Sequence, residues 1–225
     1  MLKKIHFIKK SLPALCLYGS CFTGNAQAEN TGLWVEAKYF YETSKNWELS
    51  IAPQLRFHEN FHPISEYLTS LNVSKKMAAW KPQLELRYAR ENDVSEGIFE
   101  NFFRYRFNLS YEKEFAFLEW NLRLGYQNKK QLEANRKERK VSRIRSKFKF
   151  NTEVLGFTPA LFTEYLYAHS NTKRNQLRLG VDWRKKMNVH RIGLRYMLIF
   201  YPNNNGRPAY HVLRLGYELK AKRNL

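Results

Sequence analysis

Basic residues recur at every second position along several stretches of this chain, with large apolar residues between them. Residues 176–198 read QLRLGVDWRKKMNVHRIGLRYML, in which Arg178 and Arg184 precede a polar turn and Arg191 and Arg195 follow it. A guanidinium group stays charged and presents five N–H donors, so rows of arginines can bind anions or pair with carboxylates. The pattern therefore predicts a charged surface suited to anion binding, to ion pairing, or to both.

Two segments combine serine with histidine, the residue types that hydrolyse esters when a third group orients the histidine. They are His58, His62, Ser65 and Glu66 in one segment, and His169 and Ser170 in another. Neither has the spacing of a catalytic motif, and the chain has no Gly-rich phosphate loop, HExxH helix or EF-hand sequence. We therefore predict that the protein is not an enzyme and assign no catalytic, metal or cofactor residue. A lipid-modifying hydrolase stays open as the alternative.

The elements that must position these residues show alternation of apolar and polar residues at period two, which is typical of strands with one apolar face. In residues 103–111, phenylalanine, tyrosine and leucine alternate with Arg104, Arg106, Asn108 and Ser110. Eleven such segments follow one another, near 31–41, 47–57, 65–75, 80–90, 100–112, 117–128, 141–151, 158–168, 175–184, 189–200 and 209–220.

Most of these segments are long enough to cross a bilayer as tilted strands. Short connectors such as KKMN alternate with longer polar ones such as PNNNGRP, as in outer-membrane barrels. The fold class predicted is all-β, a transmembrane antiparallel up-and-down β-barrel of about 10–12 strands, with eleven counted. Even strand numbers are usual for such barrels, so a count of eleven implies one strand too many or too few, or an unusual N-terminal segment. Pro53 and Pro82 fall within strands, where we expect β-bulges.

In such a barrel the apolar face meets lipid and the polar face lines the lumen, because a charge on the lipid face costs about 2–4 kcal/mol at the midplane. The lumen-facing charges predicted are Arg56, Arg87, Arg104, Arg106, Arg123, Arg143, Arg145, Arg178 and Arg195, with Glu85, Glu119 and Glu164 as counter-charges. Two interpretations stay open. The charges form a salt-bridged interior that fills a narrow barrel, or their basic excess favours small anionic solutes in a pore.

Four tryptophans lie on the apolar face at strand ends next to short connectors: Trp47, Trp80, Trp120 and Trp183. Aromatic girdles occupy this position at membrane interfaces. In a soluble β-sandwich we would expect tryptophans nearer the middle of strands, where burial is deepest. Their placement therefore favours a membrane barrel.

The first 28 residues have the three parts of a secretory signal peptide: a lysine-rich start, an apolar stretch, and AQA at 26–28. Cleavage after Ala28 removes four lysines, lowering the formal charge from +19 to +15, and removes both cysteines, Cys16 and Cys21. The domains predicted are a signal peptide, 1–28, and a barrel, 29–225, in the bacterial outer membrane. An alternative is lipidation of Cys21, since GSC at 19–21 resembles part of a lipoprotein signal.

The expected partners are outer-membrane lipid and the machinery that assembles barrels. Arg214, Gly216 and Leu219 resemble the C-terminal assembly signal, although the final aromatic residue is missing. The basic segment KKQLEANRKERK could contact lipopolysaccharide phosphates. Nucleic acid is not an expected partner, because the basic residues are spread over many strands and the signal peptide exports the chain.

The order of these segments resembles a family of small bacterial outer-membrane barrel proteins that is known as a domain of unknown function. The matching stretches include GLWVEAKYFYETSKNWELSIAPQLRF, RYRFNLSYEKE, RIRSKFKF and LFTEYLYAHSNTKRNQLRLGVDWR, and the resemblance spans about 31–220. It implies an outer-membrane barrel without an assigned activity, and therefore no catalytic residues.

Overall fold

The computed structural model describes residues 31–43, 46–57, 64–93, 98–132, 138–204 and 208–222. Alternating apolar and polar side chains form eleven strands here, together with a 3-10 turn at Thr172–Arg174. The strands are β1 Thr31–Glu42, β2 Trp47–Phe57, β3 Ile64–Lys75, β4 Trp80–Asp93, β5 Ile98–Glu114, β6 Leu118–Gln131, β7 Arg139–Phe150, β8 Thr158–Ala168, β9 Gln176–Met187, β10 His190–Phe200 and β11 Tyr210–Lys222.

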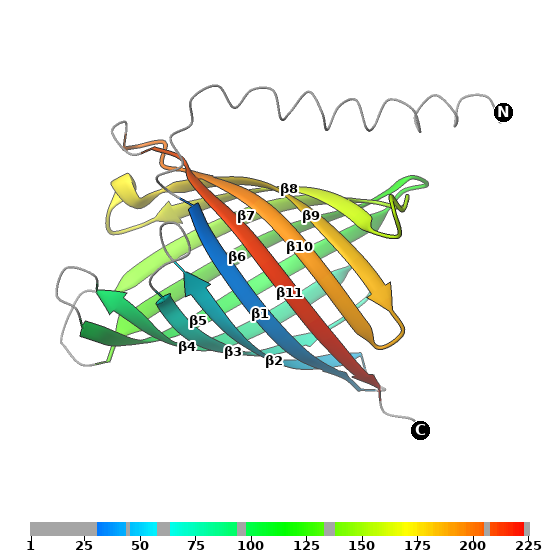
Figure 1. Ribbon diagram of the computed structural model, residues 1–225, viewed down its shortest axis with the longest axis horizontal. Helices are drawn as coiled ribbons and strands as arrows, with labels where there is room; N and C mark the ends of the chain where they lie inside the picture. The colour runs from blue at the N-terminus through cyan, green and yellow to red at the C-terminus, as the bar shows by residue number, and fades with distance from the viewer. Residues whose placement is uncertain are drawn as a thin grey trace.

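The strands form one closed barrel in which each strand pairs antiparallel with the next along the chain. The barrel closes where β1 pairs with β11, and these two strands run parallel from Thr31↔His211 to Glu42↔Lys222. Figure 1 shows this seam as the blue strand lying beside the red one. An odd number of alternating strands leaves the first and last pointing the same way. The eleven-strand barrel is therefore confirmed, and the expectation of antiparallel pairing throughout is wrong at the seam.

The two rims of the barrel follow from this order. The connections β1–β2, β3–β4, β5–β6, β7–β8 and β9–β10 lie at the rim where β11 ends, here the C-terminal rim. The other connections lie at the rim where β1 begins, here the N-terminal rim. Because β4 and β5 are longer than predicted, their connection shrinks to 94–97, while β7 and β8 are joined by 151–157. The rims therefore differ less in connection length than the sequence predicts.

The hairpin of β9 and β10 is tighter than the predicted KKMN turn. Lys185 and Met187 pair with Ile192 and His190, so both belong to the strands. Only residues 188–189 form the turn, and Asn188 takes a positive φ of 53°. Asparagine tolerates this left-handed conformation better than most residues, and two-residue hairpin turns require it.

The predicted bulges at Pro53 and Pro82 do not occur. Pro53 pairs with Thr69 and Pro82 with Leu109 without a change of register, whereas the β2–β3 register shifts between Arg56 and Phe57. A strand proline removes a single N–H donor, and that loss does not require an extra residue.

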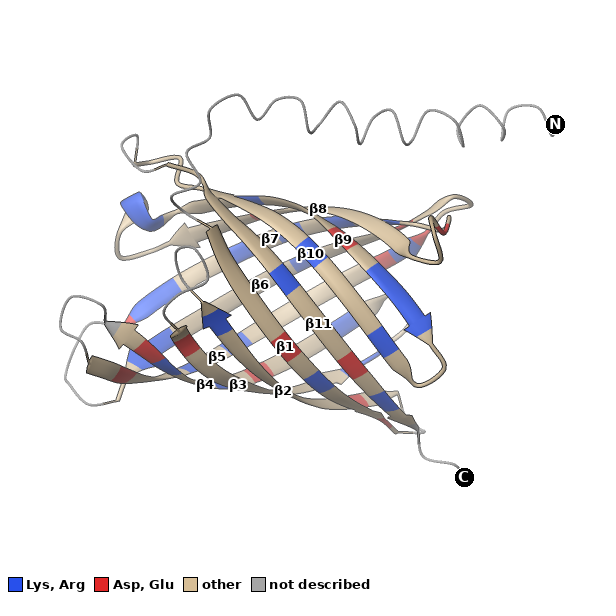
Figure 2. Ribbon diagram, in the orientation of Figure 1, with Lys and Arg blue, Asp and Glu red and all other residues tan. Residues whose placement is uncertain are grey.

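The outer surface of the barrel is apolar on every strand. Exposed large side chains include Val35, Leu55, Leu71, Leu86, Phe107, Leu124, Ile144, Leu161, Leu179, Ile192 and Leu215, one from each strand in turn. Charged residues lie in bands along the strands (Figure 2), and the side chains of many of them line the interior. The barrel is therefore inside-out relative to a soluble protein, which hides its apolar side chains.

The interior is not uniformly polar, contrary to the simple alternation. Phe162, Met197, Ile199 and Val212 form a buried cluster inside the barrel, and Trp34, Tyr201 and Tyr210 pack against it. These residues come from β8, β10, β11 and β1, and Tyr201 follows directly after β10. The lumen is therefore apolar over this patch, although the same strands also carry Arg195 and Arg214 into the cavity.

Candidate functional site: the charged lumen

A cavity of about 1050 Å³ runs inside the barrel and is lined by residues from all eleven strands. All twelve charged residues that the sequence assigns to the lumen lie in its wall. Among the described residues, twenty lysines and arginines line this cavity, against ten glutamates. The wall therefore carries about two positive groups for each negative one.

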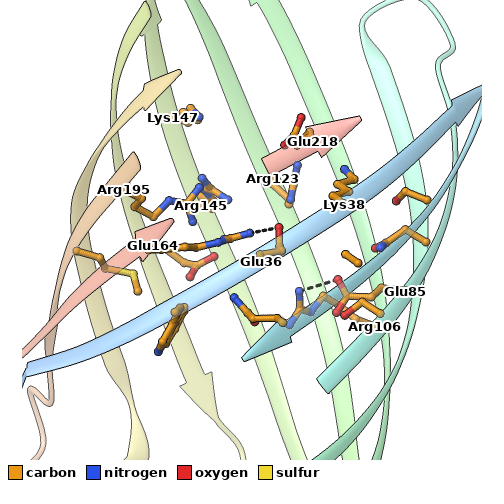
Figure 3. A pocket seen from close by; sticks show the side chains of 18 of the residues that line it. Glu36, Lys38, Glu85, Arg106, Arg123, Arg145, Lys147, Glu164, Arg195 and Glu218 are labelled. Carbon is orange, nitrogen blue, oxygen red and sulfur yellow. Dashed lines mark hydrogen bonds and ion pairs between the residues drawn. The ribbon is translucent and has the colours of Figure 1, made fainter. Parts of the chain in front are cut away.

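Glu85 on β4 joins two arginines on its own and the neighbouring strand. Its oxygens lie 3.0 Å from Arg87 and 3.0 Å from Arg106. Arg106 also donates a 3.0 Å hydrogen bond to Gln127 on β6. A buried carboxylate is stable when it is paired and hydrogen-bonded, as here. Figure 3 shows the Glu85–Arg106 contact at the cavity wall.

Glu164 on β8 bridges the strands on either side of it. Its two oxygens each lie 3.3 Å from an arginine, Arg143 on β7 and Arg178 on β9. Arg178 also donates to Gln176 at 2.5 Å. One carboxylate thus neutralises part of the charge of two arginines.

Asp182 on β9 holds the largest network, although the sequence-based set of lumen residues does not include it. It is 2% exposed and pairs with Lys147 at 2.5 Å, with Arg184 at 3.6 Å and with Arg195. It shares the alternating phase of Arg178 and Arg184, which predicts from the sequence that its side chain faces the lumen. Its partner Lys147 comes from β7, two strands away.

Ion pairs also join β1 to β11 at the seam and β2 to β3 at the N-terminal rim. Arg214 on β11 contacts Glu36 on β1 at 2.5 Å, and Lys220 contacts Glu42 at 2.5 Å. At the N-terminal rim Arg56 pairs with Glu66 at 2.5 Å and stacks on Trp34, with 4.1 Å from its guanidinium carbon to the ring centre. The seam pairs do not follow from the pattern of any one strand, because they depend on which strands meet.

Three arginines in the wall are left without such a partner. Within the described ranges, no carboxylate lies within ion-pair distance of Arg104, Arg123 or Arg145. The Nε–H groups of Arg104 and Arg145 are buried and have no hydrogen-bond partner. Arg123 donates from Nε to the hydroxyl of Ser110 at 3.0 Å. Arg104, Arg123 and Arg145 therefore place positive charge without a paired carboxylate on β5, β6 and β7.

The two Ser-His groups from the sequence are described only in part. His58 and His62 lie outside the described residues, while Ser65 donates to the carbonyl oxygen of Arg56 at 3.0 Å. His169 contacts a serine that sequence analysis missed: its Nε2 lies 2.9 Å from Oγ of Ser142 on β7. Both are on the outer surface at the N-terminal rim.

The four girdle tryptophans lie outward near the C-terminal rim. Trp47 and Trp80 are 41% and 48% exposed, and Trp80 packs on Tyr111 with 4.9 Å between ring centres. Trp120 donates from its indole N–H to Ser146 at 2.9 Å. Trp183 lies on the outer face of β9, opposite Leu194. Aromatic side chains with a polar N–H group therefore lie on the outer surface near the C-terminal rim.

In the part of the chain that the structure describes, no helix is long and apolar enough to cross a membrane. In the same part no three histidine, cysteine, aspartate or glutamate residues gather as metal ligands would.

No family model matches the chain, so the resemblance to a family of outer-membrane barrels stays a prediction. No curated protein matches it in sequence either. Among solved structures it is similar to the β domain of the Bordetella autotransporter Brka, with a TM-score of 0.44 and 11% identity over 77% of this chain and 82% of that one.

Proposed function

We propose that the protein is an outer-membrane β-barrel whose basic lumen admits small anions. The observation that carries the proposal is the excess of twenty cationic over ten acidic residues around one cavity. Rings of arginine without matching carboxylates favour anions, because they offset the cost of removing the anion from water.

The apolar outer surface supports the membrane part of this proposal. Soluble monomers rarely expose apolar patches larger than a few hundred square ångströms, whereas here every strand exposes large apolar side chains. Closure of the barrel satisfies the backbone N–H and C=O groups, which hydrocarbon cannot do. The predicted signal peptide would export the chain, as an outer-membrane barrel requires.

The test is single-channel conductance of the refolded barrel in a planar bilayer under a salt gradient. We expect discrete steps whose reversal potential indicates anion preference. Silence from a barrel whose folding is shown by heat-dependent migration on a gel would refute an open anion path. So would cation preference.

Charge reversal provides a matched variant. Replacing Arg143 and Arg145 with glutamate removes two positive charges from the lumen and adds two negative ones, so we expect the anion preference to fall or reverse. Reversing Lys140, which is half exposed at the N-terminal rim, changes the total charge with a smaller effect on the lumen. Equal selectivity in the wild type and the double variant would contradict the proposal.

Ester hydrolysis at the outer surface is a second candidate, because Ser142 and His169 are within hydrogen-bond distance near the rim. The imidazole ring of His169 also contacts the rings of Tyr126 and Tyr167. The test is release of fatty acid from phospholipid vesicles that contain the barrel. Release that Ser142→Ala abolishes would support hydrolysis, and equal release from both chains would exclude it.

The anion path is the favoured proposal, because the outer surface carries two other histidine–hydroxyl pairs of the same kind. Tyr196 and His211 lie 2.7 Å apart, and His190 and Tyr217 lie 2.6 Å apart. Tyrosine and histidine side chains with apolar bodies and polar tips suit the interface between lipid and water. The Ser142–His169 pair fits this set without any catalytic role.

A further inference from the structure

Two of the unpaired arginines face each other across neighbouring strands. Arg123 on β6 and Arg145 on β7 are direct partners in the strand register. Like charges in this position repel and destabilise a sheet. Figure 3 shows the side chains of both residues at the cavity, with Arg195 nearby. Their repulsion is relieved when an anion lies between or above the two guanidinium groups.

The neighbouring carboxylates are already occupied. Glu164 is the register partner of Arg145 on β8, but its two oxygens bind Arg143 and Arg178 at 3.3 Å each. Asp182 binds Arg195 and two further cations. Neither carboxylate can therefore neutralise Arg145 without releasing an arginine that it already holds.

An aromatic ring fixes the direction of Arg145. The ring of Phe162 on β8 lies over Gly180 on β9, where a Cβ would come within 2.5 Å of the ring. Arg145 and Arg195 both stack on this ring, with their guanidinium carbons 4.9 and 4.8 Å from its centre. A stacked guanidinium keeps its N–H edge free for an acceptor, and the Nε–H of Arg145 has none.

Arg123 is oriented by a neutral partner. Its Nε donates to the hydroxyl of Ser110, which is 1% exposed. This bond leaves the terminal nitrogens to approach the cavity, and it adds no negative charge. The two oriented guanidinium groups carry two positive charges that no carboxylate of the described residues pairs with. They therefore suit a dianion with several acceptor oxygens, since arginine pairs bidentately with phosphate.

We propose that Arg123 and Arg145 form a binding site for a phosphoryl group inside the lumen. The proposal rests on the proposed function only in requiring that anions reach the lumen, and binding can be measured whether or not the barrel conducts. The cavity volume, about 1050 Å³, leaves room for a small molecule attached to the phosphoryl group.

The test is binding of inorganic phosphate to the refolded barrel in detergent micelles, followed by phosphorus NMR line broadening and calorimetry. We expect saturable binding that Arg145→Gln and Arg123→Gln each weaken about tenfold or more, while Arg145→Lys falls between because lysine lacks the planar fork. Arg191→Gln is the control, since it removes the same charge from an arginine that pairs with Glu218 at the C-terminal rim at 3.0 Å. It should change the affinity less than twofold.

Two further ligands, methyl phosphate and acetate, show which anions the site accepts, and gel migration shows whether each variant is folded. Methyl phosphate that binds as well as inorganic phosphate assigns the site to phosphate esters, and weaker binding assigns it to the free ion. Acetate that competes equally at matched ionic strength overturns the phosphoryl site, as does equal weakening by Arg191→Gln. Each variant must keep its heat-dependent gel migration, and Arg145→Lys keeps the test decisive if a glutamine variant does not fold.

Conductance separates this inference from the proposed function. Phosphate binding by a barrel that passes no current refutes the anion path but supports the site. An anion-selective barrel that binds no phosphate supports the path but refutes the site.

Discussion

Removal of the charge of Asp182 should be among the most costly single changes in the lumen wall. The carboxylate is 2% exposed and contacts Lys147, Arg184 and Arg195. Asp182→Asn keeps the shape of the side chain but leaves these cations without their carboxylate. Breaking a buried ion pair by removing one partner costs about 3–5 kcal/mol, because the remaining charge stays buried. We expect the free energy of unfolding to fall by about that amount.

The assay is urea unfolding of the barrel folded into lipid vesicles, followed by tryptophan fluorescence and by migration on a gel. Glu119→Gln is the matched control, because Glu119 pairs with Lys149 at 2.7 Å while the two side chains are 26% and 46% exposed. Exposed pairs contribute about 0–1 kcal/mol, so this variant should change stability by less than about 1 kcal/mol.

The comparison refutes the reasoning in either of two ways. A loss below about 1 kcal/mol for Asp182→Asn would mean that water or mobile anions already screen the network. Equal losses for both variants would mean that the burial of the ion pair does not determine how much free energy of unfolding is lost. Asp182→Asn should also raise anion preference in the conductance assay, since the lumen loses a negative group.

Two other changes test the wall and the outer surface. Gly180→Ala would place a Cβ 2.5 Å from the Phe162 ring and 2.6 Å from the carbonyl oxygen of Tyr196, so we expect a loss of about 1–3 kcal/mol in urea unfolding, partly restored when Phe162→Leu shortens the ring. Ile144→Arg, on the outer face in the middle of β7, should cost about 2–4 kcal/mol in vesicles, whereas Phe117→Arg in a turn should cost about 0–1 kcal/mol. Equal costs at these two outer positions would contradict a membrane around the barrel.

Much of the fold follows from period two alone. A strand with one apolar face must alternate, and eleven alternating segments predict eleven strands within a few residues of their observed ends. The parallel seam was not predictable from any one segment, because it depends on whether the total number of strands is odd or even. The odd count nevertheless contained this information, since eleven alternating strands in a closed barrel force β1 and β11 to run the same way.

The position of a charged residue in the period-two alternation predicts whether it faces the lumen. It does not predict which residue it pairs with. Lys147 reaches Asp182 across β8, where the small side chain of Ala160 lies opposite Asp182 in the register. Ser142 meets His169 only because the β7–β8 pairing continues past Ala168, where the His169 N–H donates to the Lys140 carbonyl oxygen at 3.1 Å. Such contacts depend on register and on neighbouring side-chain size, and alternation carries neither.

A salt-bridged wall and an anion path are not alternative descriptions of this lumen. Glu85 holds two cations, Glu164 two and Asp182 three, so the carboxylates bind the positive groups to the wall without neutralising them. Arginine cannot shed its proton to relieve the excess. The ion pairs thus keep the side chains ordered, and the remaining charge must be balanced by anions from the surrounding water. Whether those anions pass or stay depends on how firmly Arg123 and Arg145 hold them, which the phosphate affinity measures directly.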